Sequence, residues 1–473
     1  MRLPSLRPLC FALAFAAAGS AGAADLMQAY ELARQSDPQL SAAESQRLAT
    51  GEGVNQSRSA LLPQVRASAG LRDGEGQSAG VEPFENADGG VSFGPISSRS
   101  ETRGRNWGLN LEQSLYDHSN YTRLRASRSR AAAADADYDA AVDALALRVA
   151  RAYFNVLTAI DSLIFARADE RAVKRQLDQA EQRFEVGLTA ITDVHEARAR
   201  YDGSRAGAIA AENALDDARE VLAELTGQYM TNLRGLDEGF SPSAPEPASL
   251  DAWVQTALSE NPLLRARSLA LEASQHDIAS ARAAHLPTLG LSAGRSGSNG
   301  WGETLFPTGN ARPANSDSLN SSISLNLTIP LYTGGRVQSQ MRQAVYTRDA
   351  TEDQLEQQRR AVTRETRSAY RAVIAGISET EARRQALVSA RSALEATEAG
   401  FEVGTRTIVD VLLAQQVLTS AQRDYSNARH GFLVNTLQLK QSAGVIEVRD
   451  IAAVNRFLVR DAEATLAEFR SED

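Results

Sequence analysis

One sequence phrase, a motif of 14 residues, occurs twice in this chain, and that repetition restricts the possible folds more than any other feature. Residues 184–197 read FEVGLTAITDVHEA, and residues 401–414 read FEVGTRTIVDVLLA. Further matches flank the phrase, because the pair Ala-Tyr at 152–153 recurs at 369–370. Repetition at a spacing of roughly 220 residues indicates a tandem duplication of one structural unit.

We therefore expect two repeats, with a linker between them and further segments at both ends. Residues 235–249 are rich in Pro, Ser and acidic residues, which is typical of a linker. The expected organisation is a signal peptide over 1–23, repeat 1 over 24–234, the linker over 235–249, repeat 2 over 250–448 and a C-terminal tail over 449–473.

The N-terminal segment has the features of a secretory signal. Arg2 and Arg7 give it a positive start, an apolar run follows, and small residues at 21–23 form a cleavage site. The alternative is a membrane helix, but the apolar run is shorter than the ~20 residues that span a bilayer. The single cysteine, Cys10, lies in this segment, so the exported chain is expected to lack disulfides and thiolate metal sites.

The composition argues against a nucleic-acid partner and against an enzyme. The formal net charge is −9 before the two N-terminal arginines are removed, and no basic patch stands out. We find no phosphate-binding loop, no HExxH and no G-x-S-x-G, and expect no metal and no cofactor. The five histidines are far apart in the sequence: His118, His195, His276, His285 and His430.

Both repeats contain segments that predict unusually long helices. Residues 109–186 contain neither Gly nor Pro, and residues 336–403 are poor in both. A helix over 121–186 would be roughly 100 Å long. The apolar side chains follow a 4,3,4,3 spacing that predicts a narrow coiled-coil seam; they are Val149, Tyr153, Val156, Ile160 and Leu163.

Gly187 and Gly404 end these long helices and allow the chain to turn back. We therefore expect antiparallel helical hairpins over about 121–225 and about 336–440, with tips near 187 and 404. An ordinary helical bundle is the alternative interpretation, although a bundle does not need helices of this length.

The segments before the long helices alternate with a period of two, which predicts strands with one apolar and one polar face. Strand pairs are expected over about 64–116 and about 287–331, with residues 72–105 and 295–319 as exposed loops. The apolar positions include Trp107, Leu109, Leu111, Leu289, Leu291, Ala293, Ile323, Leu325 and Leu327. In a membrane a sheet must close, and the smallest barrels have about eight strands. Four strands per chain therefore predict an oligomer, without fixing the number of copies.

Several long segments resemble the TolC family of outer-membrane factors over about residues 25–449. The segments read AYFNVLTAIDSL, RQLDQAEQRFEVGLTAITDV, GTRTIVDVL, LMQAYELARQSDPQL and HLPTLGLSAG. The resemblance implies a mainly α fold with membrane β, in which a homotrimer forms a twelve-stranded outer-membrane β-barrel. A long periplasmic α-helical barrel of coiled-coil hairpins would continue it.

The same resemblance implies function, location and partners. The chain would be the exit duct of tripartite efflux pumps and type I protein secretion systems, in the Gram-negative outer membrane with a large periplasmic part. It would be a passive channel, closed at its helical tips and opened when an inner-membrane pump or ABC transporter docks with its periplasmic adaptor protein. Outer-membrane lipid would surround the strands.

The resemblance also implies roles for residues at the tips. Arg406 would tie the inner hairpin to Thr192 and Asp193, Gln176 and Glu398 would form a second tie, and Asp410 would project into the pore entrance. Without the resemblance, Arg406 and Asp193 read as a solvated surface pair worth about 0–1 kcal/mol, and Asp410 as a helix-surface acid.

Two positions depart from the family pattern. Phe401 stands where the family often has a tyrosine, so a hydroxyl bond to Asp193 cannot form. Leu413 stands where the family has a second entrance aspartate, which leaves a single acidic ring. We expect weaker cation binding at the mouth and easier opening.

A soluble periplasmic coiled-coil adaptor is the main alternative function. It accounts for the signal and the helices but leaves the four alternating strands unexplained. Recovery from the outer-membrane fraction as a detergent-requiring oligomer would distinguish the two.

Overall fold

The computed structural model describes residues 24–306, 311–464, 466 and 467. The expected signal peptide, with Cys10, lies outside the described residues. The chain divides into two compact units, which are described separately. A sheet unit contains Gln46–Asp135 and Ala266–Glu356, and a helical unit contains the rest, including Ala136–Arg265 and the segment from Gln357 onward.

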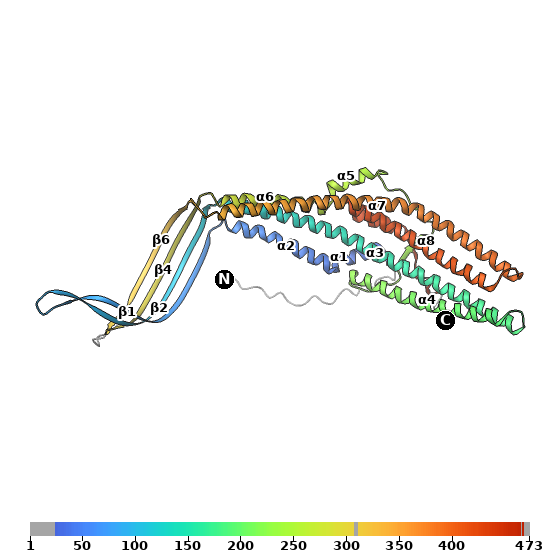
Figure 1. Cartoon of the computed structure of the whole chain (residues 1–473), viewed down its shortest axis with the longest axis horizontal. Coiled ribbons are helices and arrows are strands. Elements are labelled where there is room, and N and C mark those ends of the chain that lie inside the picture. The colour runs from blue at the N-terminus through green and yellow to red at the C-terminus, as the bar shows by residue number, and fades with distance from the viewer. Residues whose placement is uncertain (1–23, 307–310, 465, 468–473) are drawn as a thin grey trace, which may run out of the picture. The chain divides into compact units, whose positions relative to one another are not determined.

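The sheet unit is built around four long antiparallel strands that lie side by side (Figure 1). They are β1 (Gln64–Glu85), β2 (Val91–Tyr116), β4 (Thr288–Leu305) and β6 (Ser316–Thr328), with a short β5 (Ala311–Pro313) beside the end of β4. β2 pairs with β1 and β4, and β4 pairs with β6. Within the described residues, β1 and β6 each pair along one side only, so both edges of the sheet are open.

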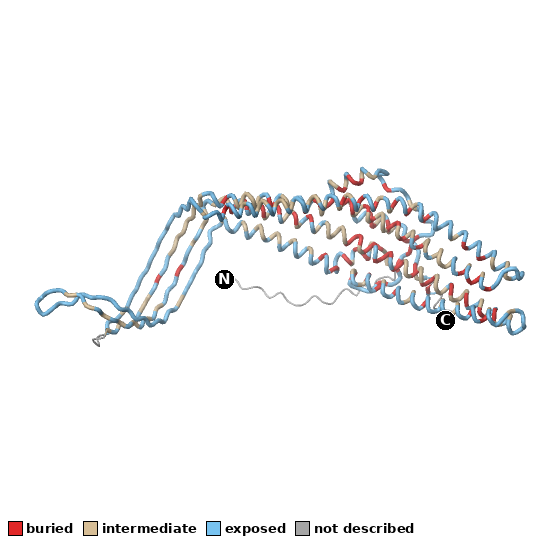
Figure 2. The backbone as a smooth tube through the Cα atoms, in the orientation of Figure 1, coloured by how far each residue is buried: buried red, intermediate tan, exposed pale blue. Residues whose placement is uncertain are grey.

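In the rows from Val65 to Ala69 of β1, the register places mainly apolar residues on one face of the sheet and mainly polar residues on the other. Val65, Leu111 and Ala293 form one cross-strand row, which Ile323 completes. The next row, on the opposite face, contains Arg66, Asn110, Gly294 and Ser322. Figure 2 shows that β1 and β6 are exposed along most of their length, whereas much of β4, between β2 and β6, is half-buried. We call the two sides the apolar face and the polar face.

The structure corrects the prediction of long loops at 72–105 and 295–319. β1 and β2 stay paired as far as Glu85 and Val91, and the turn between them contains Gly89 with a φ of 77°. β4 likewise continues to Leu305. Once the register is set, main-chain hydrogen bonds extend the ladder through polar residues, so alternation of apolar side chains underestimates strand length.

Two long helices and two return helices form the hairpins. α3 (His118–Glu185) and α7 (Arg336–Glu402) contain 68 and 67 residues. α4 (Ile191–Thr226) follows α3, and α8 (Ile408–Ala443) follows α7. One 18-residue window of α3 is long and apolar enough to cross a membrane, but half of it is buried inside the chain, as in a core helix.

The repeats also share a pair of shorter helices. These are α1 (Leu26–Ser36) and α2 (Pro38–Ser59) in repeat 1, and α5 (Leu250–Glu260) and α6 (Pro262–Ala283) in repeat 2. The residue before each proline caps the second helix, because Asp37 accepts from the Leu40 N–H at 2.9 Å and Asn261 from the Leu264 N–H at 3.1 Å.

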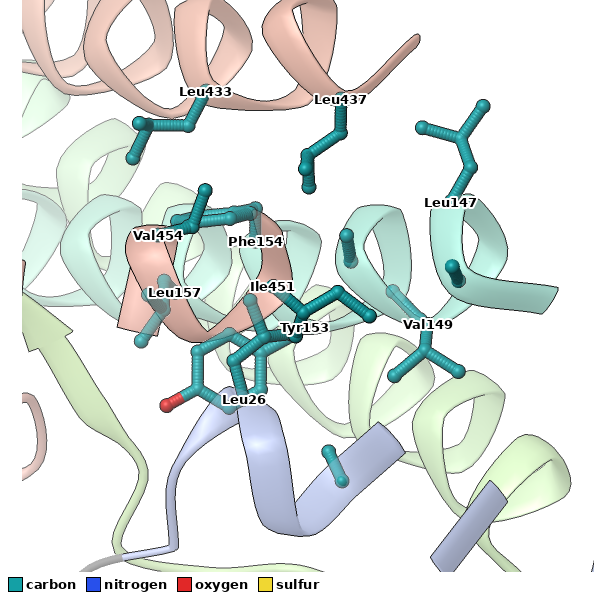
Figure 3. Close-up of a cluster of buried hydrophobic side chains, with 14 of the residues drawn as sticks. Leu26, Leu147, Val149, Tyr153, Phe154, Leu157, Leu433, Leu437, Ile451 and Val454 are labelled. Atoms are coloured by element: carbon teal, nitrogen blue, oxygen red, sulfur yellow. The ribbon is translucent and has the colours of Figure 1, made fainter. Parts of the chain in front are cut away.

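The helical unit has one main apolar core. Figure 3 shows Leu26, Tyr153, Phe154, Leu433 and Ile451 gathered from helices of both repeats and from α9 (Val448–Asn455). The Tyr153 side chain is fully buried, and its hydroxyl donates to the carbonyl oxygens of Ala24 (3.1 Å) and Arg234 (2.7 Å). These bonds satisfy a polar atom that burial would otherwise make costly.

The segment expected to be a C-terminal tail contains regular structure. After α9 comes β7 (Leu458–Asp461), which pairs antiparallel with β3 (Arg234–Leu236) at the start of the linker. The linker and the tail are therefore joined by a short sheet. Sequence alternation cannot reveal a pairing between segments so short and so distant.

Candidate functional site

The candidate site lies at the tips of the two hairpins. Gly187 and Gly404 each have a φ of 79°, in the left-handed region that glycine enters without strain. Each glycine N–H donates to the carbonyl of the phenylalanine that opens the repeated phrase, Phe184 at 2.9 Å and Phe401 at 3.1 Å. The repeated phrase therefore forms the same turn twice.

The tips pack against each other through a small apolar cluster of their own. Val173, Leu177 and Ala180 come from α3, and Ile408 and Leu412 from α8. Val194 and Ala197 of α4 complete the buried set, and Tyr201 and Phe401 are partly buried against it. All four long helices contribute, so the cluster holds hairpin 1 and hairpin 2 together.

At the second tip, Asp410 has a partner within its own helix. Thr407 is the N-cap of α8 and accepts from the Asp410 N–H at 3.3 Å. The Asp410 carboxylate in return accepts from the N–H and the hydroxyl of Thr407, both at 2.9 Å. The Thr407 N–H, then its hydroxyl and the charge of Arg406 hold the pKa of Asp410 below its usual value. Asp410 is therefore an ionised residue of a capping box.

The first tip lacks this cap because Ala190 occupies the position that Thr407 has in the second repeat. Ala190 makes no side-chain hydrogen bond to the start of α4. Asp193, the repeat equivalent of Asp410, accepts instead from the hydroxyl of Thr189, and the Thr192 hydroxyl lies 3.5 Å from its other oxygen. The two equivalent aspartates are thus held by different neighbours.

Arg406 lies in the turn between α7 and α8, against the end of α7. Its N–H donates to the Gly400 carbonyl at 3.1 Å. A Cβ at position 400 would come within 2.8 Å of the Arg406 Cγ, so the absence of a side chain at Gly400 makes room for the arginine. Within the described part of this single chain, Arg406 forms no ion pair with a carboxylate, and its charge acts on Asp410 only through space.

The second expected tie is also not formed inside one chain. The Oε1 atom of Gln176 is buried without a hydrogen-bond partner in the described structure, and Glu398 is exposed on α7. A buried acceptor without a hydrogen-bond partner is costly. Leu413, at the second departure from the family pattern, is 56% exposed.

No pattern in the sequence predicts one of the contacts between the hairpins. The guanidinium of Arg183, on α3, lies 4.8 Å from the ring centre of Phe401, on α7, in a cation–π arrangement. Phe401 thus contacts the other hairpin through its ring, which needs no hydroxyl. The only hint in the sequence is that the residue before the repeated phrase is Arg183 in one copy and Gly400 in the other.

Polar side chains also connect α3 with α8, along the contact between these two helices. Thr158 lies 2.9 Å from Nδ1 of His430, Asp161 accepts from the Ser426 hydroxyl, and Asp169 accepts from the Thr419 hydroxyl at 3.0 Å. Burial, with a smaller effect of nearby Arg429, lowers the pKa of His430 to about 3, so the imidazole is neutral. Burial likewise raises the pKa of Asp161.

These features define a class of protein with two units. One unit has a sheet with an apolar face and a polar face, as in membrane-spanning strands, and the other has two helical hairpins whose tips pack together. No cluster of metal-binding side chains occurs among the described residues. The sequence pattern of the family described as "Outer membrane efflux protein" matches residues 29–228 and 253–445. The chain belongs to this family, and its location is the outer membrane.

Individual relatives agree with this assignment. The outer membrane protein TolC of Vibrio cholerae is 38% identical over 455 residues, which cover 96% of this chain and 98% of the relative. The alkaline protease secretion protein AprF of Pseudomonas aeruginosa is 28% identical over 431 residues, covering 91% and 86%. The solved structure of CusC, at 19% identity, has the same fold with a TM-score of 0.71 and covers 93% of this chain and 98% of CusC.

Proposed function

We propose that three copies of this chain form a channel through the outer membrane, the exit duct for efflux and for type I protein secretion. The observation that carries the proposal is the four-stranded sheet, which has one apolar face, one polar face and two open edges. Open edges cannot remain in lipid, where each unpaired main-chain group costs several kcal/mol. Pairing of β6 in one copy with β1 of the next removes every edge once the ring closes.

In the trimer, the apolar faces meet lipid and the polar faces line a water-filled lumen. Twelve strands result, and the hairpins of the three copies form a helical barrel in the periplasm. A channel of this kind needs no energy source of its own. An inner-membrane pump or ABC transporter, joined through a periplasmic adaptor protein, supplies the driving force. The description of the family as outer membrane efflux proteins and the name of one relative, a protease secretion protein, support this function over a soluble adaptor.

The assembly can be tested on the purified full-length protein. We expect it to require detergent, to have the mass of a trimer by light scattering, and to insert into planar bilayers as a conducting channel. A water-soluble monomer that never inserts would overturn the proposal.

We further propose that the hairpin tips are the gate. Arg406 reaches Thr192 and Asp193, and Gln176 reaches Glu398, across the boundary between neighbouring copies. The buried, unsatisfied Oε1 of Gln176 supports such a contact. Asp410 of the three copies forms an acidic ring at the mouth.

Replacement of Arg406 by serine should loosen the closed state and raise the single-channel conductance. Arg423→Ser is the matched control, because Arg423 is an exposed arginine further along α8. Conductance that is the same in wild type and Arg406→Ser would count strongly against the gate assignment.

A further inference from the structure

One arginine lies among the apolar rows of the sheet, whereas the other charged residues of the same face, from the row of Arg105 onward, lie nearer the turn between β1 and β2. Arg295 on β4 lies in the same cross-strand row as Leu109 on β2 and Ser321 on β6. Ala293, the preceding residue on the same face of β4, belongs to the apolar row with Leu111. Arg295 is exposed. An arginine inside an apolar band is costly in lipid unless a specific partner compensates its charge.

Arg295 also differs from the other arginines on its face. Three of these have partners across the strands: Arg99 pairs with Glu75 (2.5 Å), Arg103 with Asp73 (3.4 Å) and Arg105 with Asn299 (3.4 Å). No hydrogen bond or ion pair joins Arg295 to any described residue of the chain. β4 lies between β2 and β6, so a neighbouring copy that adds a strand at an edge does not cover it.

A hollow of about 680 Å³ adjoins Arg295 on the apolar face. Val65, Leu109, Leu111 and Ile323 form its apolar sides. Ala293 makes it shallowly concave, because its side chain is small and lies between those of Leu111 and Ile323 in the same cross-strand row. Arg295 lies at one end of the hollow, two residues along β4 from the row that contains Leu111 and Ile323. Apolar side chains thus line most of the hollow, and a positively charged side chain lies at one end.

We propose that Arg295 and this hollow bind one lipid with an anionic phosphate headgroup. The guanidinium donates to the phosphate oxygens in the paired geometry that arginine favours, and an acyl chain lies along Leu111 and Ile323. Charge complementarity selects the occupant, because a zwitterionic headgroup carries a second cation that Arg295 repels. The inference rests on the proposed function, in which this face meets lipid.

The test uses the full-length protein in detergent micelles. Phosphatidylglycerol and phosphatidylcholine with identical acyl chains are added in equal amounts, and retained lipid is counted by native mass spectrometry. Wild type should retain phosphatidylglycerol about tenfold better, because Arg295 repels the choline cation that only phosphatidylcholine carries; tenfold corresponds to about 1.4 kcal/mol. Arg295→Gln should lose that preference. Arg295→Lys should keep part of it, since lysine keeps the positive charge but cannot donate the two parallel hydrogen bonds of a guanidinium.

Arg66→Gln is the matched control. Arg66 lies on the polar face of the same sheet, 3.7 Å from Glu112, and its loss should leave the lipid preference unchanged. Equal retention of both lipids by wild type would overturn the proposal, even if every variant failed to assemble. A preference that survives in Arg295→Gln would overturn it as well.

Bilayer conductance of the same samples separates this proposal from the proposed function. A conducting wild-type channel without a lipid preference contradicts only the lipid site. A protein that neither inserts nor conducts contradicts the channel itself.

Discussion

The contact between Arg183 and Phe401 leads to a sharp prediction about gating. The two residues join the tips of the two hairpins, with the guanidinium 4.8 Å from the ring centre. A cation–π contact of this kind contributes about 1 kcal/mol at a partly exposed site. If three copies open together, its loss totals about 3 kcal/mol, which is roughly a hundredfold change in the ratio of open to closed channels. If the copies open independently, the change is about fivefold for each.

A double-mutant cycle isolates this contact from other effects of each substitution. Arg183→Gln should raise the open probability in planar bilayers strongly in the wild-type background and only weakly in the Phe401→Leu background. Phe184→Leu is the matched control, because Phe184 is the repeat equivalent of Phe401 and is 42% exposed. Equal effects of Arg183→Gln in the wild-type and Phe401→Leu backgrounds would show that the two side chains do not interact, and would refute the reasoning.

Three further predictions concern the tips and the seam. Gly400→Ala should displace Arg406, because the new Cβ would lie 2.8 Å from the Cγ of Arg406. The substitution should therefore raise the single-channel conductance as Arg406→Ser does, and a Gly400→Ala channel with the wild-type conductance would contradict this. Thr407→Ala should cost about 1 kcal/mol through the lost N-cap, and Ala190→Thr should gain a similar amount at the equivalent position, measured by hydrogen exchange at the start of each return helix. The pKa of His430 is lowered to about 3 from 6.5, so its stabilising effect is complete above about pH 6.5 and is lost as pH falls towards about 3, by up to about 1.4 kcal/mol per pH unit. His430→Phe should therefore lose less stability than wild type between about pH 7 and about pH 5, and parallel losses would count against a buried neutral imidazole.

The easier opening expected from Phe401 stays a prediction, and the structure adds contacts of Phe401 and Asp193 that bear on it. The missing hydroxyl predicted a weaker closed state, since a bond to Asp193 is lost. The ring of Phe401 nevertheless contacts Arg183 and packs against the apolar cluster at the tips. Asp193 in turn accepts from Thr189, whose role the sequence did not indicate. Phe401 and Asp193 therefore both have partners within the chain that need no hydroxyl at position 401.

Local patterns in the sequence were sufficient for the features that depend on neighbouring residues. The doubled phrase marks both turns, because glycine is needed at a φ of 79° whatever surrounds it. The length of α3 and α7 follows from the scarcity of helix breakers, and the two faces of the sheet follow from alternation with a period of two. Each of these properties is fixed by the covalent geometry of a few adjacent residues.

Only the tertiary structure decided which distant residues meet. The strands at 72–85 and 91–105, the pairing of β3 with β7, the burial of His430 and the contact of Arg183 with Phe401 all join segments that are far apart or carry no periodic signal. Such contacts depend on register and packing, which many sequences can satisfy in different ways. Periodicity therefore determined what each segment of this chain is, and packing determined which partner each side chain has.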